Sequence, residues 1–280
     1  MIIFSSSPYF KKIYETLSDA GFKIDCLITE SPKPAGRGLR LTKNPAHEFA
    51  DEVGLSTSFS QPIAGSFDLG LIHAYGKIIP QNVIDKFKHG ILNIHPSLLP
   101  KYRGASPIIS PILNGDKKTG YSIILTDKKC DTGDIVAQQE IDISDNDTHD
   151  TLREKIMTLA INDLPRVLKD YLEGKIKLRP QDESQTSMTS KVKKSDGQIL
   201  ERESVRSAYN KIRAFSDWPK AFFIIDGKRI IVHSAIMVGE KIDLISVQVE
   251  GKNKISFLDF KHGYASLLTK LPKFVRITEE

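Results

Sequence analysis

Residues 67–74 read Phe67-Asp68-Leu69-Gly70-Leu71-Ile72-His73-Ala74, a mostly apolar run of about the length of one strand. Such a run is typical of a parallel sheet that is covered on both faces. A helical pattern spans residues 8–20. Similar short apolar runs lie around these segments, at residues 2–4, 22–29, 91–95, 121–126 and 135–143. This alternation predicts a doubly wound, mostly parallel, Rossmann-like α/β sheet, with functional sites at the carboxyl ends of its strands.

The composition changes after Gly174, where residues 175–194 become polar and are interrupted by Pro180. A helical stripe follows at residues 204–215, and four short strand patterns follow at residues 221–225, 229–235, 242–249 and 255–260. Asp226-Gly227 lies between the first two and favours a tight hairpin, because both residues tolerate positive φ. We therefore expect a catalytic domain at residues 1–176, a linker at residues 177–198, and a small β-barrel of the oligonucleotide-binding (OB) type at residues 199–280.

The overall composition is that of an ordinary globular protein. The chain has 280 residues, of which 40% are hydrophobic and 27% charged, and its net charge of +5 favours an anionic partner only weakly. Cys26 and Cys130 are its two cysteines, too few for a disulfide framework or a cysteine zinc site. No signal peptide or membrane span is visible in the sequence, so we expect a cytoplasmic monomer.

The chemistry is concentrated in residues 90–104, which read Gly-Ile-Leu-Asn-Ile-His-Pro-Ser-Leu-Leu-Pro-Lys-Tyr-Arg-Gly. Asn93 and His95 are two residues apart on a strand, so their side chains point the same way, and Pro96 then ends the strand. An amide donor beside an imidazole suits acyl transfer. Taken as two residues alone, however, they favour a turn cap and a satisfied core histidine.

The whole string changes this balance, because it resembles the signature of the 10-formyltetrahydrofolate-dependent formyltransferases. That resemblance implies a catalytic trio of Asn93, His95 and Asp131, the last within Cys130-Asp131-Thr132-Gly133-Asp134. A carboxylate beside an imidazole raises the pKa of the imidazole. The resemblance therefore implies that Asn93 and a protonated His95 stabilise the oxyanion of the tetrahedral intermediate, without a metal.

The resemblance also implies the co-substrate, 10-formyltetrahydrofolate. The Leu-Leu-Pro segment matches the folate-contacting loop of the family, and Ala-Tyr-Gly matches a motif that lines the same cleft. The expected folate contacts are Ser97, Leu98, Leu99, Pro100, Tyr75 and Gly76. The chain departs from the family at Ser5-Ser6-Ser7-Pro8, where a Gly-Thr-Pro turn is usual. This turn also lacks the glycines that a nicotinamide-dependent oxidoreductase needs against a pyrophosphate.

The acceptor is predicted from residues 31–45, which contain no acidic residue. The cations there are Lys33, Arg37, Arg40 and Lys43. A long basic connection suits contact with phosphates, although a solvated basic loop is the simpler alternative. Pro-Ala-Gly-Arg-Gly resembles the tRNA-contacting loop of those family members that formylate methionyl-tRNA. It implies initiator methionyl-tRNA as the partner and Arg37 as the central contact.

Two alternatives remain open. An enzyme that formylates a nucleotide-linked amino sugar would share the Asn, His and Asp trio. A non-catalytic tRNA-binding protein would have no chemical reason to keep all three residues. Residues 213–219, Arg-Ala-Phe-Ser-Asp-Trp-Pro, resemble the motif that begins the tRNA-binding C-terminal barrel of the family, but amino-sugar enzymes share that motif. The C-terminal domain is also shorter than is typical, which implies a weaker grip on tRNA.

Overall fold

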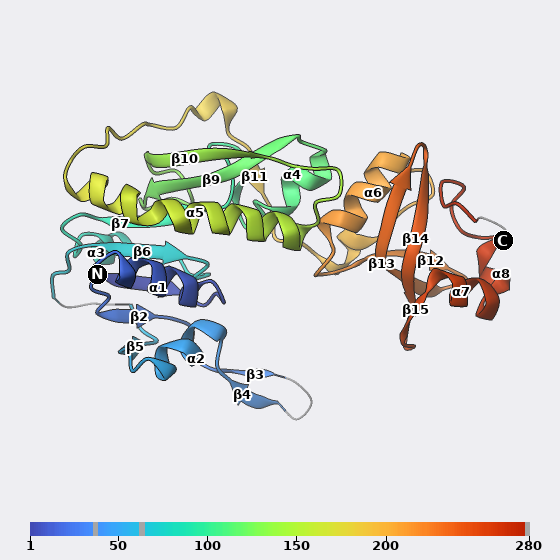
Figure 1. Ribbon diagram of the computed structural model, residues 1–280, viewed down its shortest axis with the longest axis horizontal. Helices are drawn as coiled ribbons and strands as arrows, with labels where there is room; N and C mark the ends of the chain where they lie inside the picture. Colours follow the sequence, from blue (N-terminus) through green and yellow to red (C-terminus); the bar gives the residue numbers. More distant parts are fainter. Residues whose placement is uncertain (36–38, 62–64, 278–280) are drawn as a thin grey trace. The chain divides into compact units, whose positions relative to one another are not determined.

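The computed structural model describes the chain except for residues 36–38, 62–64 and 278–280 (Figure 1). Its contacts divide the chain into two compact units. The first consists of Met1–Gly104, Gly120–Glu140 and Lys155–Met188, and the second of Ala105–Thr119, Ile141–Glu154 and Thr189–Glu280. Each unit is therefore assembled from three separate stretches of the chain.

The larger sheet contains seven strands in the described part of the chain, in the order β10-β9-β7-β6-β1-β2-β5. Adjacent strands from β5 to β7 pair in parallel, and β9 is antiparallel to β7. The predicted mostly parallel, Rossmann-like sheet is thus confirmed. The strands are β1 (Ile2–Ser5), β2 (Cys26–Ile28), β5 (Thr57–Ser58), β6 (Gly70–His73), β7 (Ile91–His95), β9 (Lys118–Leu125) and β10 (Ile135–Asp142).

One face of this sheet is covered by α5 (His149–Leu172), and the other carries the polar residues of β7. His95 lies opposite Ser122 in the β7–β9 pair, so these two side chains share a face. Tyr121, one residue earlier, points to the opposite face, where its hydroxyl donates to Asp163 of α5. Asn93 alternates with buried neighbours and shares the face of His95.

The polar face of β7 continues into an apolar core toward the start of the strand. Ile91 is fully buried there and packs against α3 (Gln81–Ile84). The remaining members of this core come from β1, β2 and the segments around α3, namely Ile2, Phe4, Ile28, Tyr75, Ile79, Val83, Ile84 and Phe87. The same strand is thus anchored by apolar burial at its start and presents its polar side chains at its end.

The second unit contains a four-stranded antiparallel sheet among its described residues, with the order β12-β13-β14-β15. Its strands are β12 (Ala221–Ile225), β13 (Lys228–Val238), β14 (Lys241–Val249) and β15 (Lys254–Ser256). Asp226 and Gly227 both have positive φ between β12 and β13, which confirms the predicted hairpin. The helix α6 (Val205–Ala214) packs its apolar stripe into the core of this sheet.

Two expected strands differ from the structure. The pattern at residues 22–29 forms a strand only over Cys26–Ile28. The strand expected at residues 255–260 is wrong, because β15 ends at Ser256 and the helix α7 (Phe257–Gly263) begins there. The Ser256 hydroxyl accepts a hydrogen bond from the backbone N–H of Asp259, and this cap favours a helix over a further strand.

The remaining elements are short. They are α1 (Phe10–Asp19), α2 (Pro45–Glu52), α4 (Ile109–Asn114), α8 (Ala265–Leu268), β3 (Lys33–Ala35), β4 (Arg40–Thr42), β8 (Arg103–Gly104), β11 (Met188–Thr189) and two 3₁₀ turns at Glu183–Gln185 and Lys194–Gly197.

Candidate active site

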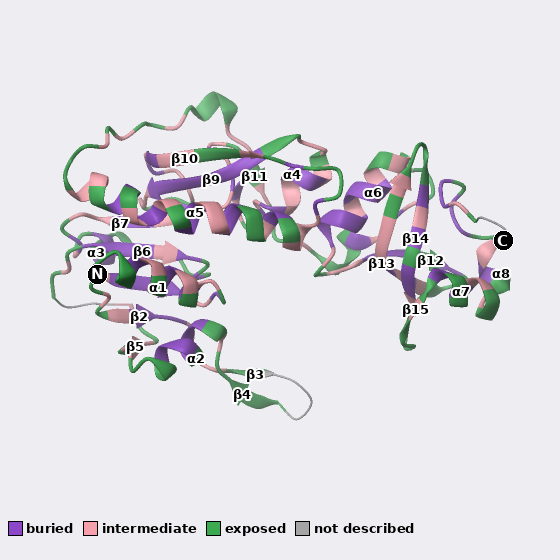
Figure 2. Ribbon diagram, in the orientation of Figure 1, coloured by how far each residue is buried: buried purple, intermediate pink, exposed green. Residues whose placement is uncertain are grey.

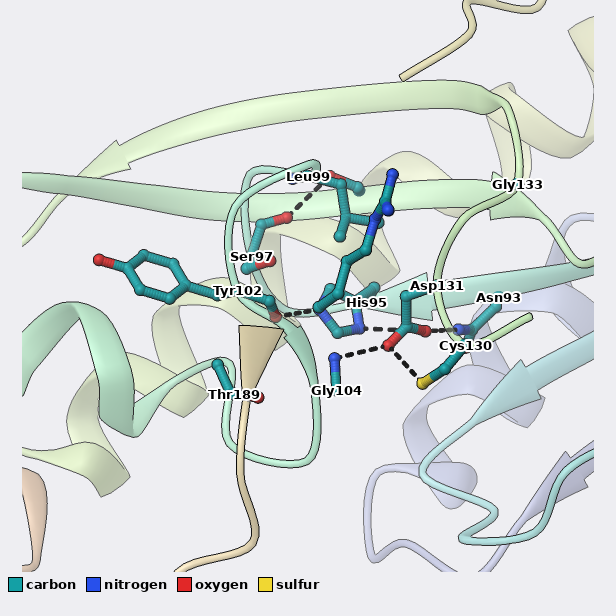
Figure 3. A network of polar contacts seen from close by, with 12 residues as sticks. Asn93, His95, Ser97, Leu99, Tyr102, Gly104, Cys130, Asp131, Gly133 and Thr189 are labelled. Atoms are coloured by element: carbon teal, nitrogen blue, oxygen red, sulfur yellow. Dashed lines mark hydrogen bonds and ion pairs between the residues drawn. The ribbon is translucent and has the colours of Figure 1, made fainter. Parts of the chain in front are cut away.

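Asn93, His95 and Asp131 meet at the carboxyl end of β7 (Figure 3). Asn93 donates from Nδ2 to Oδ1 of Asp131 at 3.2 Å, and His95 Nδ1 lies 3.6 Å from the same oxygen. The backbone N–H of Gly104 donates to the other carboxylate oxygen at 2.9 Å. The three residues expected to form the trio, 38 positions apart along the chain, therefore share one contact network.

Asp131 lies in a turn with an unusual backbone. Its φ is 56°, in the left-handed region that costs a residue with a Cβ free energy. Gly133 follows, and a Cβ at this position would lie 1.6 Å from the carbonyl oxygen of Leu125. The Asp-Thr-Gly sequence is therefore a geometric requirement, since the turn needs both the strained aspartate and a glycine against β9.

His95 is a buried imidazole whose protonation state follows from its surroundings. Nε2 lies 3.0 Å from the carbonyl oxygen of Tyr102, which can only accept, so Nε2 carries a hydrogen. Burial lowers the pKa of His95 below its ordinary value, although Asp131 and the Tyr102 carbonyl act in the opposite direction. The expectation of a protonated ring is therefore wrong. The neutral imidazole leaves a lone pair on Nδ1, on the side that faces Asp131.

Cys130 adds a further donor to the carboxylate. Its thiol donates to Oδ2 of Asp131 at 3.2 Å. Burial of the thiol, followed by the neighbouring Asp131 charge, raises the pKa of Cys130 to about 11. The group is consequently a neutral thiol at pH 7, and it acts here as a hydrogen-bond donor.

The Ser97–Leu98–Leu99–Pro100 segment follows β7 and is held from below by polar contacts. Ser97 is fully buried, and its hydroxyl donates to the carbonyl of Lys101 at 2.7 Å. Leu99 is 3% exposed and packs with Ile124 and Ile135, whereas Leu98 and Pro100 are half-buried. Within the expected folate-contacting segment, Leu99 is thus a core residue, and Leu98 is the leucine that has exposed surface.

Tyr75 and Gly76 lie after β6 and differ from each other. Tyr75 is 2% exposed and packs edge-on against Phe4, with ring centroids 5.4 Å apart. Gly76 has a φ of 76° and is exposed. The ring of Tyr75 therefore belongs to the core beneath the strands, and Gly76 provides the turn that a side chain would strain.

Four polar residues that support the site were not predicted from the sequence. Ser122 of β9 accepts from the backbone N–H of Leu99, and Gln138 of β10 donates to the Leu99 carbonyl. Arg103 and Gln181 form a second group beside the Asp131 turn. Arg103 was visible within the Tyr-Arg-Gly signature. Gln181 carried no signal, because it lies in a polar segment that indicated a linker.

A cavity of about 790 Å³ opens beside the same turn. Its lining carries three cations and two carboxylates: it consists of Gln81, Arg103, Asp127, Lys128, Lys129, Thr132 and Glu183. Asp127 accepts from the Thr132 hydroxyl and the Lys129 backbone N–H, so the loop that forms this wall is internally bonded.

The basic segment forms a two-stranded hairpin instead of the expected irregular connection. Lys33 pairs with Glu30, and Lys43 pairs with Asp51. Arg40 is exposed on β4, whereas Arg37 lies outside the described residues. Figure 2 shows that the described part of this hairpin is exposed, and Leu39 and Leu41 are each 73% exposed.

Two sequence profiles match the chain. The Formyl transferase profile covers residues 1–168, and the profile of the Formyl transferase C-terminal domain covers residues 191–243. A methionyl-tRNA formyltransferase of Wolbachia pipientis is 34% identical to it, over 98% of this chain and 99% of that protein. One from Coxiella burnetii is 33% identical over 86% of this chain and 81% of that protein.

Solved structures with the same fold include proteins that act on different acceptors. A 4-N formyltransferase from Francisella tularensis aligns with a TM-score of 0.69 at 19% identity, covering 85% of this chain and 97% of that one. A methionyl-tRNA formyltransferase from Clostridium thermocellum aligns with a TM-score of 0.60 at 21% identity, covering 91% and 97%. Among the described residues, no helix is both long enough and apolar enough to span a membrane.

Proposed function

The chain belongs to the formyl transferase family, and we propose that it transfers a formyl group from 10-formyltetrahydrofolate to the amino group of methionine on initiator tRNA. The observation that carries this proposal is the convergence of Asn93, His95 and Asp131 on one carboxylate at the end of β7. Relatives that are named methionyl-tRNA formyltransferases and match most of the chain support the choice of acceptor.

The donors at the site fit a formyl group. Asn93 has two N–H bonds on Nδ2, and one of them is directed to Asp131. The second is free to donate to the formyl oxygen as negative charge develops on it. Asp131 holds the amide in place from behind, so the donor does not need to reorient during the reaction.

His95 supplies the base. The neutral ring keeps Nε2–H on the Tyr102 carbonyl, and Nδ1 can accept a proton from the attacking amine. The C–N bond to the amine forms, the bond from the formyl carbon to the folate nitrogen breaks, and one proton passes from the amine to that nitrogen. Asp131 stabilises the imidazolium during this transfer, because its Oδ1 lies 3.6 Å from Nδ1.

We propose that folate contacts the loop after β7, with Leu98 and Pro100 as its exposed apolar surface, together with Gly76 after β6. Solved structures of sugar formyltransferases with the same fold were obtained with formylated folates, which supports this co-substrate. We further propose that the β3–β4 hairpin, with Lys33, Arg37, Arg40 and Lys43, contacts tRNA phosphates.

A second candidate acceptor is a nucleotide-linked amino sugar, which several proteins of the same fold formylate. The test is to incubate the protein with 10-formyltetrahydrofolate and either methionyl-tRNA or a dTDP-linked amino sugar. We expect formylmethionine on the tRNA and no formylated sugar. Formylation of the sugar alone would overturn the proposed acceptor, and formylation of neither would overturn the proposed activity.

A further inference from the structure

Asp131 holds its catalytic orientation at a cost. A left-handed backbone at a non-glycine residue persists only where surrounding contacts fix it. The contacts of its side chain with Asn93 and Gly104 position the carboxylate, but they do not restrain the peptide groups of the turn. The restraint on those peptide groups comes from a distant part of the chain.

Gln181 makes these backbone contacts. Its Nε2 donates to the carbonyl oxygens of Asp131 at 2.9 Å and of Gly133 at 2.7 Å. Its Oε1 accepts from Nε and Nη2 of Arg103, at 3.0 and 2.8 Å. The amide thus uses both donors and accepts two hydrogen bonds, so only one orientation of the side chain satisfies the site.

Arg103 is fixed in turn. It is 3% exposed, and its Nη1 and Nη2 donate to the two oxygens of Glu183 at 3.1 and 2.8 Å. A bidentate pair of this kind holds a guanidinium plane at a defined angle. The next residue, Gly104, donates directly to the Asp131 carboxylate. The segment Arg103–Gly104 therefore reaches Asp131 by two routes, one to its side chain and one through Gln181 to its backbone.

We propose that Gln181 is a positioning residue for formyl transfer: fixed by Arg103, it holds the Asp131 turn so that the carboxylate stays against Asn93 and His95. This inference rests on the proposed function. It assigns a specific task to a residue of the polar segment that the sequence indicated to be a linker. Gln181 itself contacts neither His95 nor Asn93 in the described interactions, so its effect is exerted through Asp131.

The test is Gln181→Met, which conserves volume and removes every amide contact. Gln185→Met is its matched control, because Gln185 lies in the same segment, is exposed and bonds only to Asp182 in the described contacts. We expect kcat of Gln181→Met to fall about 10- to 100-fold, the range for a weakened general acid–base step, with little change in KM for folate. Gln185→Met should match the parent protein.

A second measurement needs no substrate. The charged and titratable groups near His95 are Asp131, Cys130 and Arg103, and only Asp131 lies within 4 Å of its ring. Displacing the Asp131 carboxylate removes the charge that raises the pKa of His95. The titration of the His95 ring, followed by NMR, should therefore move to lower pH in Gln181→Met, and the acid limb of kcat/KM should move with it.

These readouts separate the possible failures. If the parent protein does not formylate methionyl-tRNA, the proposed function fails, yet the His95 titration still tests the position of Asp131. If the parent is active and a folded Gln181→Met keeps both its kcat and its His95 titration, the positioning role is overturned. Gln181→Asn keeps the amide on a shorter stem and replaces Gln181→Met if the latter does not fold. It should show the same changes in kcat and titration, and parental values would overturn the role.

Discussion

Asn93 and Cys130 both donate to the carboxylate of Asp131, but only Asn93 has a second hydrogen for the substrate. This difference gives a matched pair of substitutions. Asn93→Ala should lower kcat about 10²-fold or more, the usual effect of losing an oxyanion donor, and His95→Ala and Asp131→Ala should have effects of similar size.

Cys130→Ala is the control for this series, because it removes a neutral donor and leaves the trio intact. Single-turnover formylation measures the effect, and thermal unfolding shows whether each variant folds. Parental turnover in a folded Asn93→Ala would remove Asn93 from the mechanism.

His73 is a buried histidine of β6 that the proposed mechanism does not use. Its Nδ1 has no hydrogen-bond partner among the described residues, and burial lowers its pKa from 6.5 to about 4. The folded state therefore disfavours the charged ring. The stability tied to His73 is complete above pH 6.5, because both states are then neutral, and it is lost as the pH falls toward 4.

The loss should amount to an order of 3 kcal/mol, since one pKa unit corresponds to about 1.4 kcal/mol. Chemical denaturation between pH 7 and pH 4 measures it. Burial also lowers the pKa values of His95 and His149, so the parent protein should lose more than the share of His73. His73→Leu should make the slope of stability against pH clearly shallower, and an unchanged slope would contradict the assignment.

At the scale of elements, the loop after β7 contains two leucines with different surroundings. Leu99 is buried with Ile124 and Ile135, and Leu98 is half-buried. Leu99→Asp should therefore destabilise the fold by several kcal/mol, because it places a carboxylate in an apolar cluster. Leu98→Asp should mainly weaken the binding of a folate analogue, as measured by calorimetry. Unchanged affinity in a folded Leu98→Asp would show that this leucine is not part of the folate surface.

Element boundaries show which features the sequence could predict. The strand at Ile91–His95 and the hairpin at Asp226-Gly227 were predicted correctly, because proline breaks and turn-forming residues mark them locally. Residues 257–260 were predicted as strand, since Phe257, Leu258 and Phe260 fit an alternating pattern as well as a helical one. The cap at Ser256 was the stronger signal.

The candidate site divides in the same way. Asn93, His95 and Asp131 were found from a local signature, and the structure brings them together. The protonation state of His95 could not be predicted, because it depends on how deeply the fold buries the ring. Gln181 was missed for a similar reason: its four hydrogen bonds reach residues about 50 and 80 positions away, and nothing in the neighbouring sequence indicates them.

At the scale of the whole molecule, folate and tRNA should depend on different parts of the first unit. The proposed folate surface follows β7, whereas the cations at residues 33–43 lie on and around the β3–β4 hairpin. Arg37→Ala should therefore reduce the use of methionyl-tRNA and leave folate affinity intact. The slope of tRNA affinity against salt should flatten by about one counterion for each phosphate that the substitution leaves without its cation.

Arg37→Lys should restore only part of this activity, because lysine keeps the charge but does not have the planar fork. Lys33→Ala provides a comparison within the hairpin, since its ammonium group is already paired with Glu30 and should contribute less. If Arg37→Ala uses methionyl-tRNA as well as the parent does at both low and physiological salt, the segment is a solvated basic loop. The amino-sugar acceptor would then be favoured.

The interleaved course of the chain has a consequence for how the protein can be divided. Arg213 is 5% exposed, and its Nη1 donates to the carbonyl oxygens of Ser144 and Asp147, which belong to the same unit although they precede it by 69 and 66 positions. A truncation after Met188 would remove this guanidinium and leave unsatisfied the two carbonyl groups that it bonds. Separately expressed halves cut near that point should therefore aggregate or be rapidly degraded, whereas mixing them during refolding should recover soluble protein by fragment complementation.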